Sequence, residues 1–399
     1  MRLAIIGAAL LAAGIAAVLA GILPVSDVAA LVARVGPILV FVAAMTVVTE
    51  LLSEAGLFLW FARRFRRWGR GRMVVLWLLV AAFAVATTVF LSLDTTAVLL
   101  TPIVVSVARQ AGLPVLPFAL TTVWLANTGS LLLPISNLTN LLAQHTLGGI
   151  APVEFAALML APAAAAVVVP LLFIGIVFRK DLAKRYSRVP VARIRAVEAG
   201  EPPPGSRGVD RVLLASGAVV LAVLLPLLVS GMPVWIPSSG AAVVLAGVFL
   251  VRRRQALTPM LVPWSLLLFA AGLFLVMETT RHLGAPALLT ALAGQGEGMG
   301  DLLRLAATGA VGSNLLNNLP AYLAAEPVTG SPTRMAALLV GVNAGPLITP
   351  WASLATLLWH DRLVKMNVLI TWRGFAIFGA IVAPVTVLAA VVALAASAG

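Results

Sequence analysis

Long apolar segments separated by short polar ones fill the chain of 399 residues. A membrane-spanning helix needs about 20 predominantly apolar residues, and nine segments approach or exceed that length. These segments are residues 3–23, 33–52, 113–148, 155–178, 211–230, 236–251, 262–280, 335–358 and 372–396. The pattern predicts an all-α polytopic membrane protein with about nine spans.

Two further apolar stretches, residues 73–109 and 300–328, are interrupted by polar clusters at residues 92–96 and 313–320. We expect each stretch to form a re-entrant hairpin that returns to the side from which it entered. This assignment is preferred because it places all three of the most basic loops on one side of the membrane.

The two halves of the chain resemble each other in sequence. Residues 127–142 (NTGSLLLPISNLTNLL) match residues 343–358 (NAGPLITPWASLATLL) at seven of sixteen positions. Both segments place Gly, Pro and small polar residues inside predicted spans, 113–148 and 335–358. We therefore expect each of these spans to be an unwound helix.

This repeat predicts two structural halves, residues 1–178 and 211–399, joined by a basic cytoplasmic linker at 179–210. In the predicted topology the first hairpin enters from the cytoplasm and the second from outside. Such inverted repeats are typical of secondary transporters, which hold their cargo near the membrane midplane between broken helices.

Composition agrees with a membrane location, since 61% of residues are hydrophobic and only 10% are charged. A soluble domain has roughly 25% charged residues, so the soluble class is excluded. The absence of cysteine excludes disulfide bonds and thiolate metal sites.

The net charge of +13 reflects the orientation of the chain in the membrane. Of the 27 Lys and Arg residues, 18 fall in three short segments, residues 63–72, 179–211 and 252–254. This clustering follows the positive-inside rule and argues against a nucleic-acid partner. It places the N-terminus and the basic loops in the cytoplasm, with the protein in the cell (inner) membrane, and residues 50–62 turning along the cytoplasmic surface.

Four polar clusters interrupt the hairpins and unwound helices at matched repeat positions. Small polar residues in a membrane either pack helices together or form a site, and four matched clusters favour a site. It would suit a small polyhydroxy or oxyanion-like solute, a cation, or both. The predicted binding residues are Thr95, Thr96, Asn127, Thr128, Ser130, Ser136, Asn137, Ser313, Asn314, Asn317, Asn318, Asn343, Thr349 and Ser353, with Asn140 and Thr356 in the same clusters.

Asp94 is the only charged residue in these clusters. A carboxylate at membrane depth costs at least about 2.5–3.5 kcal/mol and usually marks an ion or proton pathway. The alternative is a helix cap, since Asp is a good N-cap residue. We predict that Asp94 couples transport to an ion or proton, whereas Glu50 and Glu278 lie near span ends, where they meet the interface.

Motifs for ATP hydrolysis or metal-dependent hydrolysis are absent from the sequence. The three histidines are scattered, so neither a metal site nor a cofactor is predicted. An intramembrane enzyme would have to use Asp94 as a lone acid, because a second aspartate or a Ser/Lys pair at membrane depth is missing. We therefore expect a transporter and not an enzyme.

Four motifs resemble the arsenical-pump membrane protein family, the arsenite/antimonite efflux permeases of the ion transporter superfamily. The resemblance covers nearly the whole chain. The motifs are LSLDTTAVLLTPIV (91–104), ANTGSLLLPISNLTN (126–140), SNLLNNLPA (313–321) and GVNAGPLITPWASLATLLW (341–359).

The resemblance implies a scaffold with a mobile, elevator-type transport domain, and exchange of arsenite or antimonite for protons. It also implies a cytosolic ATPase partner in some systems, and a homodimer is a further partner hypothesis. The first repeat is one span short at its N-terminus, which puts part of the scaffold in doubt. Asn127 and Asn343 stand where some family members carry an acid, which concentrates proton coupling on Asp94.

The sequence therefore predicts a proton-coupled arsenite/antimonite exporter that works by alternating access. One alternative keeps the fold but carries an organic anion with sodium, or exchanges sodium for protons. The lack of Arg or Lys within the polar breaks counts against a dicarboxylate. A channel, which would conduct only down a gradient, is the third hypothesis.

Overall fold

The chain is built from helices within the part that the computed structural model describes, residues 2–186, 210–284, 290 and 292–398. Seven of these helices are long and apolar enough to cross a membrane. They are α2 (Val25–Glu54), α4 (Met73–Leu91), α9 (Pro152–Val177), α12 (Arg211–Leu228), α13 (Trp235–Arg252), α14 (Trp264–His282) and α20 (Trp372–Ala398). The predicted all-α polytopic fold is confirmed.

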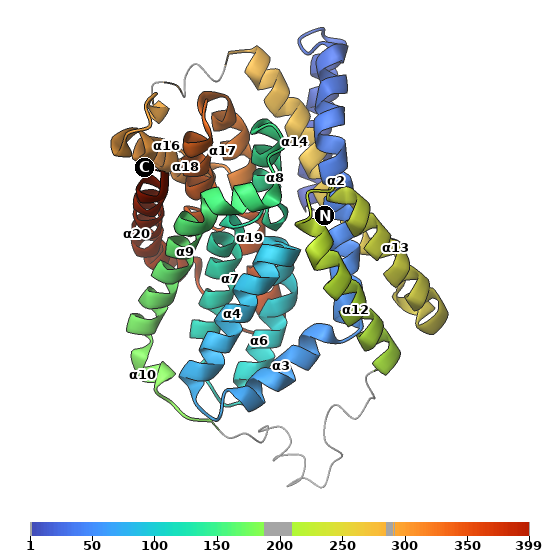
Figure 1. Cartoon of the computed structure of the whole chain (residues 1–399), viewed down its shortest axis with the longest axis vertical. Helices are drawn as coiled ribbons and strands as arrows, with labels where there is room; N and C mark the ends of the chain where they lie inside the picture. The colour runs from blue at the N-terminus through green and yellow to red at the C-terminus, as the bar shows by residue number, and fades with distance from the viewer. Residues whose placement is uncertain (1, 187–209, 285–289, 291, 399) are drawn as a thin grey trace.

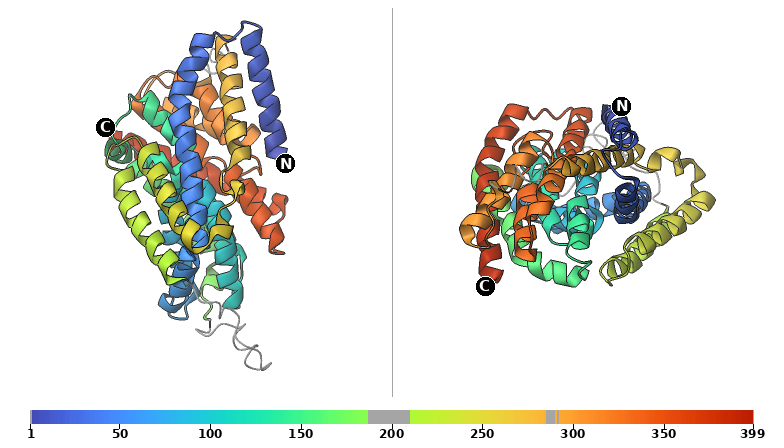
Figure 2. Two further views of the ribbon diagram at one scale, coloured as in Figure 1. Left: turned by 90° about the vertical axis from the view of Figure 1, so that its right-hand side faces the viewer. Right: turned by 90° about the horizontal axis from the view of Figure 1, so that it is seen from above.

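A flanking layer of five helices lies along one side of the molecule (Figure 1). It consists of α2, α12, α13, α14 and the shorter α1 (Arg2–Leu19). α2 has 30 residues, about 45 Å at the helical rise, and runs the full length of this layer (Figure 2). α1 packs against α14 because Gly7 and Gly272 let the two backbones approach closely.

The remaining long helices form a central body. Its first hairpin comprises α4, α5 (Leu93–Thr95), the π-helical turn η1 (Thr96–Leu100) and α6 (Thr101–Gln110). A broken helix, α7 (Leu116–Thr128) and α8 (Leu138–Thr146), and then α9 follow. The second half contributes the hairpin α16 (Met299–Leu315) and α17 (Asn318–Ala325), the broken helix α18 (Pro332–Ala344) and α19 (Leu354–Lys365), and finally α20.

The two hairpins approach the middle of the body from opposite ends (Figure 1). Both arms of the first hairpin contact α3 (Leu57–Trp68) near one end, whereas α16 and α17 lie at the other. The first hairpin breaks at Ser92, whose φ of 111° lies outside the regular helical region. The second breaks between Leu315 and Asn318.

Several predicted spans match the observed helices closely, because uninterrupted apolar runs mark them. The ends of α9, α12, α13, α14 and α20 differ from the predicted ones by three residues or fewer. The predicted turn of residues 50–62 along the surface was wrong in its first part. Here α2 continues to Glu54, and the chain turns at Gly56 (φ 84°) before α3 begins.

Two other segments differ from the prediction in where their helices lie. α19 continues to Lys365, seven residues past the predicted end, because polar residues can carry a helix beyond the apolar band. The predicted linker begins with the short helix α10 (Arg179–Leu182), and most of it, residues 187–209, lies outside the described residues.

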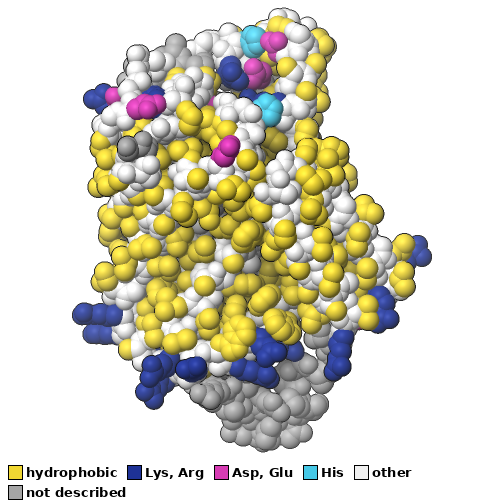
Figure 3. All heavy atoms as spheres, in the orientation of Figure 1, with side chains coloured by type: hydrophobic (Ala, Val, Ile, Leu, Met, Phe, Trp, Pro, Cys, Tyr) yellow, Lys and Arg dark blue, Asp and Glu magenta, His cyan; other side chains and the backbone are white. Residues whose placement is uncertain are grey.

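One end of the molecule is strongly basic. Figure 3 shows Lys and Arg side chains gathered there, at the margin of a broad apolar surface. α3 contributes to this basic end as an amphipathic helix, since Phe58, Ala62 and Phe65 are buried while Arg63, Arg64 and Arg67 are exposed. Among the described residues, the clustered charges of the sequence therefore gather at this end of the molecule.

Close packing of α16 against α18 holds the second half of the body together. A Cβ added to Gly341 of α18 would clash with the backbone carbonyl of Ala306 in α16, and one added to Gly345 would clash with Ala310. Glycine at these positions thus lets two helix backbones lie in direct contact.

We predict that Gly341→Ala lowers the stability of the protein by about 1–3 kcal/mol, because the added methyl group forces α16 and α18 apart. The measurement is the thermal unfolding of the detergent-purified protein. Gly175→Ala in α9 is the matched control, since an added Cβ meets nothing within 4 Å there. A Gly341→Ala protein that unfolds at the wild-type temperature would contradict this role of the glycine.

Candidate transport site

Each hairpin packs against the broken helix of the other half. The turn η1 of the first hairpin contacts α19, and α17 of the second hairpin contacts α8. The two breaks of the first half therefore meet elements that lie more than 150 residues away in sequence. This crossed arrangement brings polar residues of both halves to the centre of the body.

Asn343 of α18 lies at the centre of a buried amide cluster. Its side-chain oxygen accepts hydrogen bonds from Asn137 Nδ2 and Thr139 Oγ1, each at 2.9 Å. Its nitrogen donates to Asn140 Oδ1 at 2.7 Å. Asn140 in turn donates to the carbonyls of Ser130 and Leu133, which the unwound stretch leaves without helical partners. This cluster fastens the first unwound stretch to the second half.

Asn314 of α16 binds the backbone groups of the second unwound stretch. Its side-chain oxygen accepts from the backbone nitrogens of Ile348 and Thr349, and its nitrogen donates to the carbonyl of Gly345. One residue therefore satisfies three backbone groups in a stretch that has lost its helical hydrogen bonds.

The tip of the first hairpin presents Asp94. Ser92 Oγ accepts from the backbone nitrogen of Thr95 at 3.3 Å and caps the short helix α5. Ser92, and not Asp94, is therefore the capping residue. Asp94 Oδ1 is buried and has no hydrogen-bond partner among the described residues. This carboxylate is available for a proton, an ion or a polar cargo.

A cavity of about 450 Å³ lies between the flanking layer and the central body, and Asp94 lines it. Apolar residues of α2, α8 and the segment 260–267 form much of its wall. Its polar and charged lining consists of Thr46, Thr49, Glu50, Ser92, Asp94, Thr95, Asn137, Ser265 and Arg362. The described residues contain no cluster of three or more metal-ligating acids or histidines.

Three of the predicted site residues, Asp94, Thr95 and Asn137, line this cavity together. The others lie outside its wall. They are Thr96, Asn127, Thr128, Ser130, Ser136, Ser313, Asn314, Asn317, Asn318, Asn343, Thr349 and Ser353.

Several of these residues outside the cavity wall form hydrogen bonds that support the hairpin tips and the unwound stretches. Thr96 Oγ1 hydrogen-bonds to Thr87 and Thr88 of α4, and Ser136 donates to the carbonyl of Val89. Asn317 donates to the carbonyl of Trp351. Others, and Thr356 of the same clusters, keep buried oxygen atoms without a hydrogen-bond partner among the described residues. These atoms are Asn127 Oδ1, Thr128 Oγ1, Ser353 Oγ and Thr356 Oγ1.

Sequence reasoning missed two charged residues of the cavity. Glu50 was expected at the membrane interface and Arg362 was given no role, yet both lie in the wall. Their helical spacing in the sequence could have indicated that they share a helix face with other residues of the cavity wall. Thr46, Thr49 and Glu50 follow i, i+3, i+4 spacing on α2, and Arg362 follows Leu354 and Leu358 at four-residue intervals on α19, so each set shares one helix face.

An ion pair joins the flanking layer to the second hairpin. Glu326, only 5% exposed, forms an ion pair with Arg34 of α2 and accepts hydrogen bonds from Thr146 and from Tyr322, the latter at 3.0 Å. Sequence analysis assigned no role to either charged residue. The pair connects α2 to the end of α17 away from the cavity.

The chain is similar to known membrane transporters. A family model described as a citrate transporter matches residues 1–334. The arsenical pump membrane protein of Escherichia coli K12 is 32% identical over 354 residues, which cover 82% of this chain and 79% of that protein. A putative arsenical pump membrane protein of Bacillus subtilis is 23% identical over 93% of this chain and 89% of its own length.

A solved structure shares the fold. The crystal structure of the Alcanivorax borkumensis YdaH transporter aligns with a TM-score of 0.57 at 17% identity, over 92% of this chain and 86% of that one. The crossed hairpins, broken helices and central cavity thus define an integral membrane transporter of the ion transporter superfamily. Within that superfamily, the chain belongs to the arsenical pump membrane protein family.

We predict that Asn343→Ala destabilises the protein by about 1–3 kcal/mol, because it leaves Asn137, Thr139 and Asn140 without their buried partner. Thermal unfolding in detergent is the measurement. Thr308→Ala is the control, since it removes only a bond to the carbonyl of Arg304 on the same helix. Equal unfolding temperatures for the two variants would show that the amide cluster does not hold the halves together.

Proposed function

We propose that the protein exports arsenite and antimonite from the cytoplasm in exchange for protons, by alternating access. The observation that carries this proposal is Asp94, whose carboxylate lines the central cavity with one buried oxygen that has no hydrogen-bond partner in the described part of the chain. The similarity to arsenical pump membrane proteins suggests the cargo.

The cavity lining suits this cargo chemically. Arsenite is mostly an uncharged trihydroxide at neutral pH, and its hydroxyls can bond to Thr, Ser and Asn groups such as Thr46, Thr95 and Asn137. These groups bind less tightly than thiolates would, so the cargo can be released. Asp94 would accept a proton when cargo leaves and lose it when cargo binds, which gives exchange through a single cavity.

The basic face would lie in the cytoplasm of the cell membrane, following the positive-inside rule. In this orientation the first hairpin enters from the cytoplasm and the second from outside. The flanking layer would act as the scaffold and the central body as the moving part. The cavity between them would open alternately as the body moves.

We expect Asp94→Asn to abolish arsenite resistance in a sensitive host while membrane abundance stays at the wild-type level, because the amide cannot carry the proton. Growth on graded arsenite and immunoblotting of membranes are the measurements. Asp361→Asn, which removes an exposed partner of Lys365, is the control and should keep full resistance. Normal resistance in Asp94→Asn would refute the coupling role.

A sodium-coupled carrier of organic anions is the second candidate, because Arg362 provides a cation on the cavity wall. The matching citrate transporter model points in the same direction. However, the wall also carries Glu50 and Asp94, so its two carboxylates outnumber its single guanidinium. A multivalent anion would be repelled unless both acids were neutralised, which favours the uncharged cargo.

Transport in everted vesicles separates these candidates. An acidic vesicle interior should drive arsenite uptake above equilibrium, independently of sodium, and a protonophore should abolish the accumulation. Citrate uptake that requires sodium, with no response to arsenite, would instead establish the anion carrier. Arsenite movement that only equilibrates under a pH gradient would indicate a channel.

A further inference from the structure

A second concave surface lies at the basic face, where the first hairpin begins. Its volume is about 590 Å³, and it is lined by Trp68, Arg70, Arg72, Val75 and Arg185. Three guanidinium groups therefore face one cavity that contains no acidic lining residue. This cavity shares no lining residue with the central cavity.

The backbone holds two of these arginines directly opposite each other. Tyr186 N donates to the carbonyl of Gly71, and Met73 N donates to the carbonyl of Lys184, both within 3.0 Å. These bonds form an antiparallel bridge in which Arg72 and Arg185 are the facing, non-hydrogen-bonded pair. Such pairs bring side chains closest together on the same side of the ladder.

The turn before the bridge is also tightly constrained. Arg70 adopts φ 51° and Gly71 φ 78°, both in the left-handed region. A Cβ on Gly69 would clash with the hydroxyl of Tyr186. Packing and hydrogen bonds therefore hold the turn that carries Arg70 and Arg72 against the segment that carries Arg185.

Like charges that face each other across an antiparallel pair are destabilising unless an anion lies between them. Two other arginines of the basic clusters do have acidic partners, Arg252 with Asp210 and Arg253 with Glu54. Among the residues that the structure describes, Arg70, Arg72 and Arg185 have no acidic partner within 4.0 Å. An anionic ligand would remove this repulsion.

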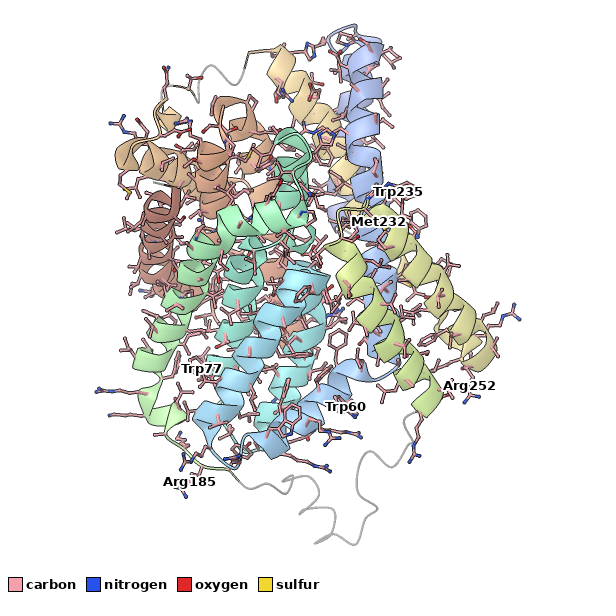
Figure 4. All side chains as sticks on the ribbon, in the orientation of Figure 1. Trp60, Trp77, Arg185, Met232, Trp235 and Arg252 are labelled. Atoms are coloured by element: carbon pink, nitrogen blue, oxygen red, sulfur yellow. The ribbon has the colours of Figure 1, made fainter. Side chains whose placement is uncertain are left out.

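The cavity lies where a membrane surface is expected. Figure 4 places Arg185 at the end of the molecule where the basic side chains gather, and Figure 3 shows this end bordering the apolar surface. Trp68, 48% exposed, adds an indole ring, which favours the level of lipid head groups. Val75 adds an apolar side chain to the lining.

We propose that this cavity binds the head group of an anionic phospholipid, with the phosphate held by Arg70, Arg72 and Arg185. Guanidinium groups bind phosphate oxygens in a bidentate, charge-assisted manner. A free phosphate would satisfy the same charges. The lipid is favoured because Trp68 and Val75 add apolar surface to the wall, at an end of the molecule that borders the broad apolar surface, where acyl chains would lie.

The test is native mass spectrometry of the full-length protein in neutral detergent, titrated with phosphatidylglycerol, phosphatidylcholine or glycerol 3-phosphate. Wild type should bind phosphatidylglycerol more tightly than the other two. Arg72→Ala/Arg185→Ala should weaken this binding roughly tenfold. The control Arg179→Ala/Arg254→Ala removes the same charge from exposed positions outside the cavity and should bind phosphatidylglycerol like wild type.

Equal phosphatidylglycerol binding by the cavity variant and wild type would overturn the proposal, as would equal loss in the control. Binding of glycerol 3-phosphate as tight as that of the lipid would assign the site to a soluble phosphate and refute the lipid. If the alanine variant does not fold, Arg72→Gln/Arg185→Gln keeps part of the aliphatic stem and a polar end without the charge, and should show the same loss. None of these results depends on the cargo transported.

Discussion

The structure depends on one constraint, which is that backbone groups released inside a bilayer must find partners within the protein. The central body contains two unwound stretches, near residues 129–137 and 345–353. Asn140 and Asn314 satisfy their carbonyls and nitrogens through side-chain amides. An amide serves because it donates and accepts at once, whereas a carboxylate would add the cost of burying a charge.

The same constraint explains how the two halves are joined. Asn343 contributes its amide to a cluster of residues from the first unwound stretch and α8, more than 200 residues away. The amide cluster therefore joins the two halves, whereas the backbone groups of each unwound stretch are bound by an asparagine of the same half. The cavity lies beside this joint, with Asn137 belonging both to the amide cluster and to the cavity wall.

Hydropathy and the polar residues that interrupt apolar segments predicted the fold well, because both are local properties of the sequence. Uninterrupted spans such as α9 and α13 and the break at Ser92 are marked by neighbouring residues alone. The cavity was predicted only in part. Glu50 and Arg362 sit in continuous helices without a local break, and their convergence on Asp94 depends on how α2 and α19 pack. Most of the predicted binding residues lie outside the cavity wall, because the sequence does not distinguish a polar residue that binds cargo from one that supports the backbone.

The ion pair between Arg34 and Glu326 has a consequence for the proposed movement. If the central body slides past α2, this pair must separate, because its members lie on opposite sides of the sliding boundary. Separation would leave a nearly buried carboxylate without its counter-charge, which is strongly unfavourable until water or a new cation reaches it. The pair would therefore stabilise discrete positions of the carrier. Each movement would have to break it, so the hydration of Glu326 would be a step of the transport cycle.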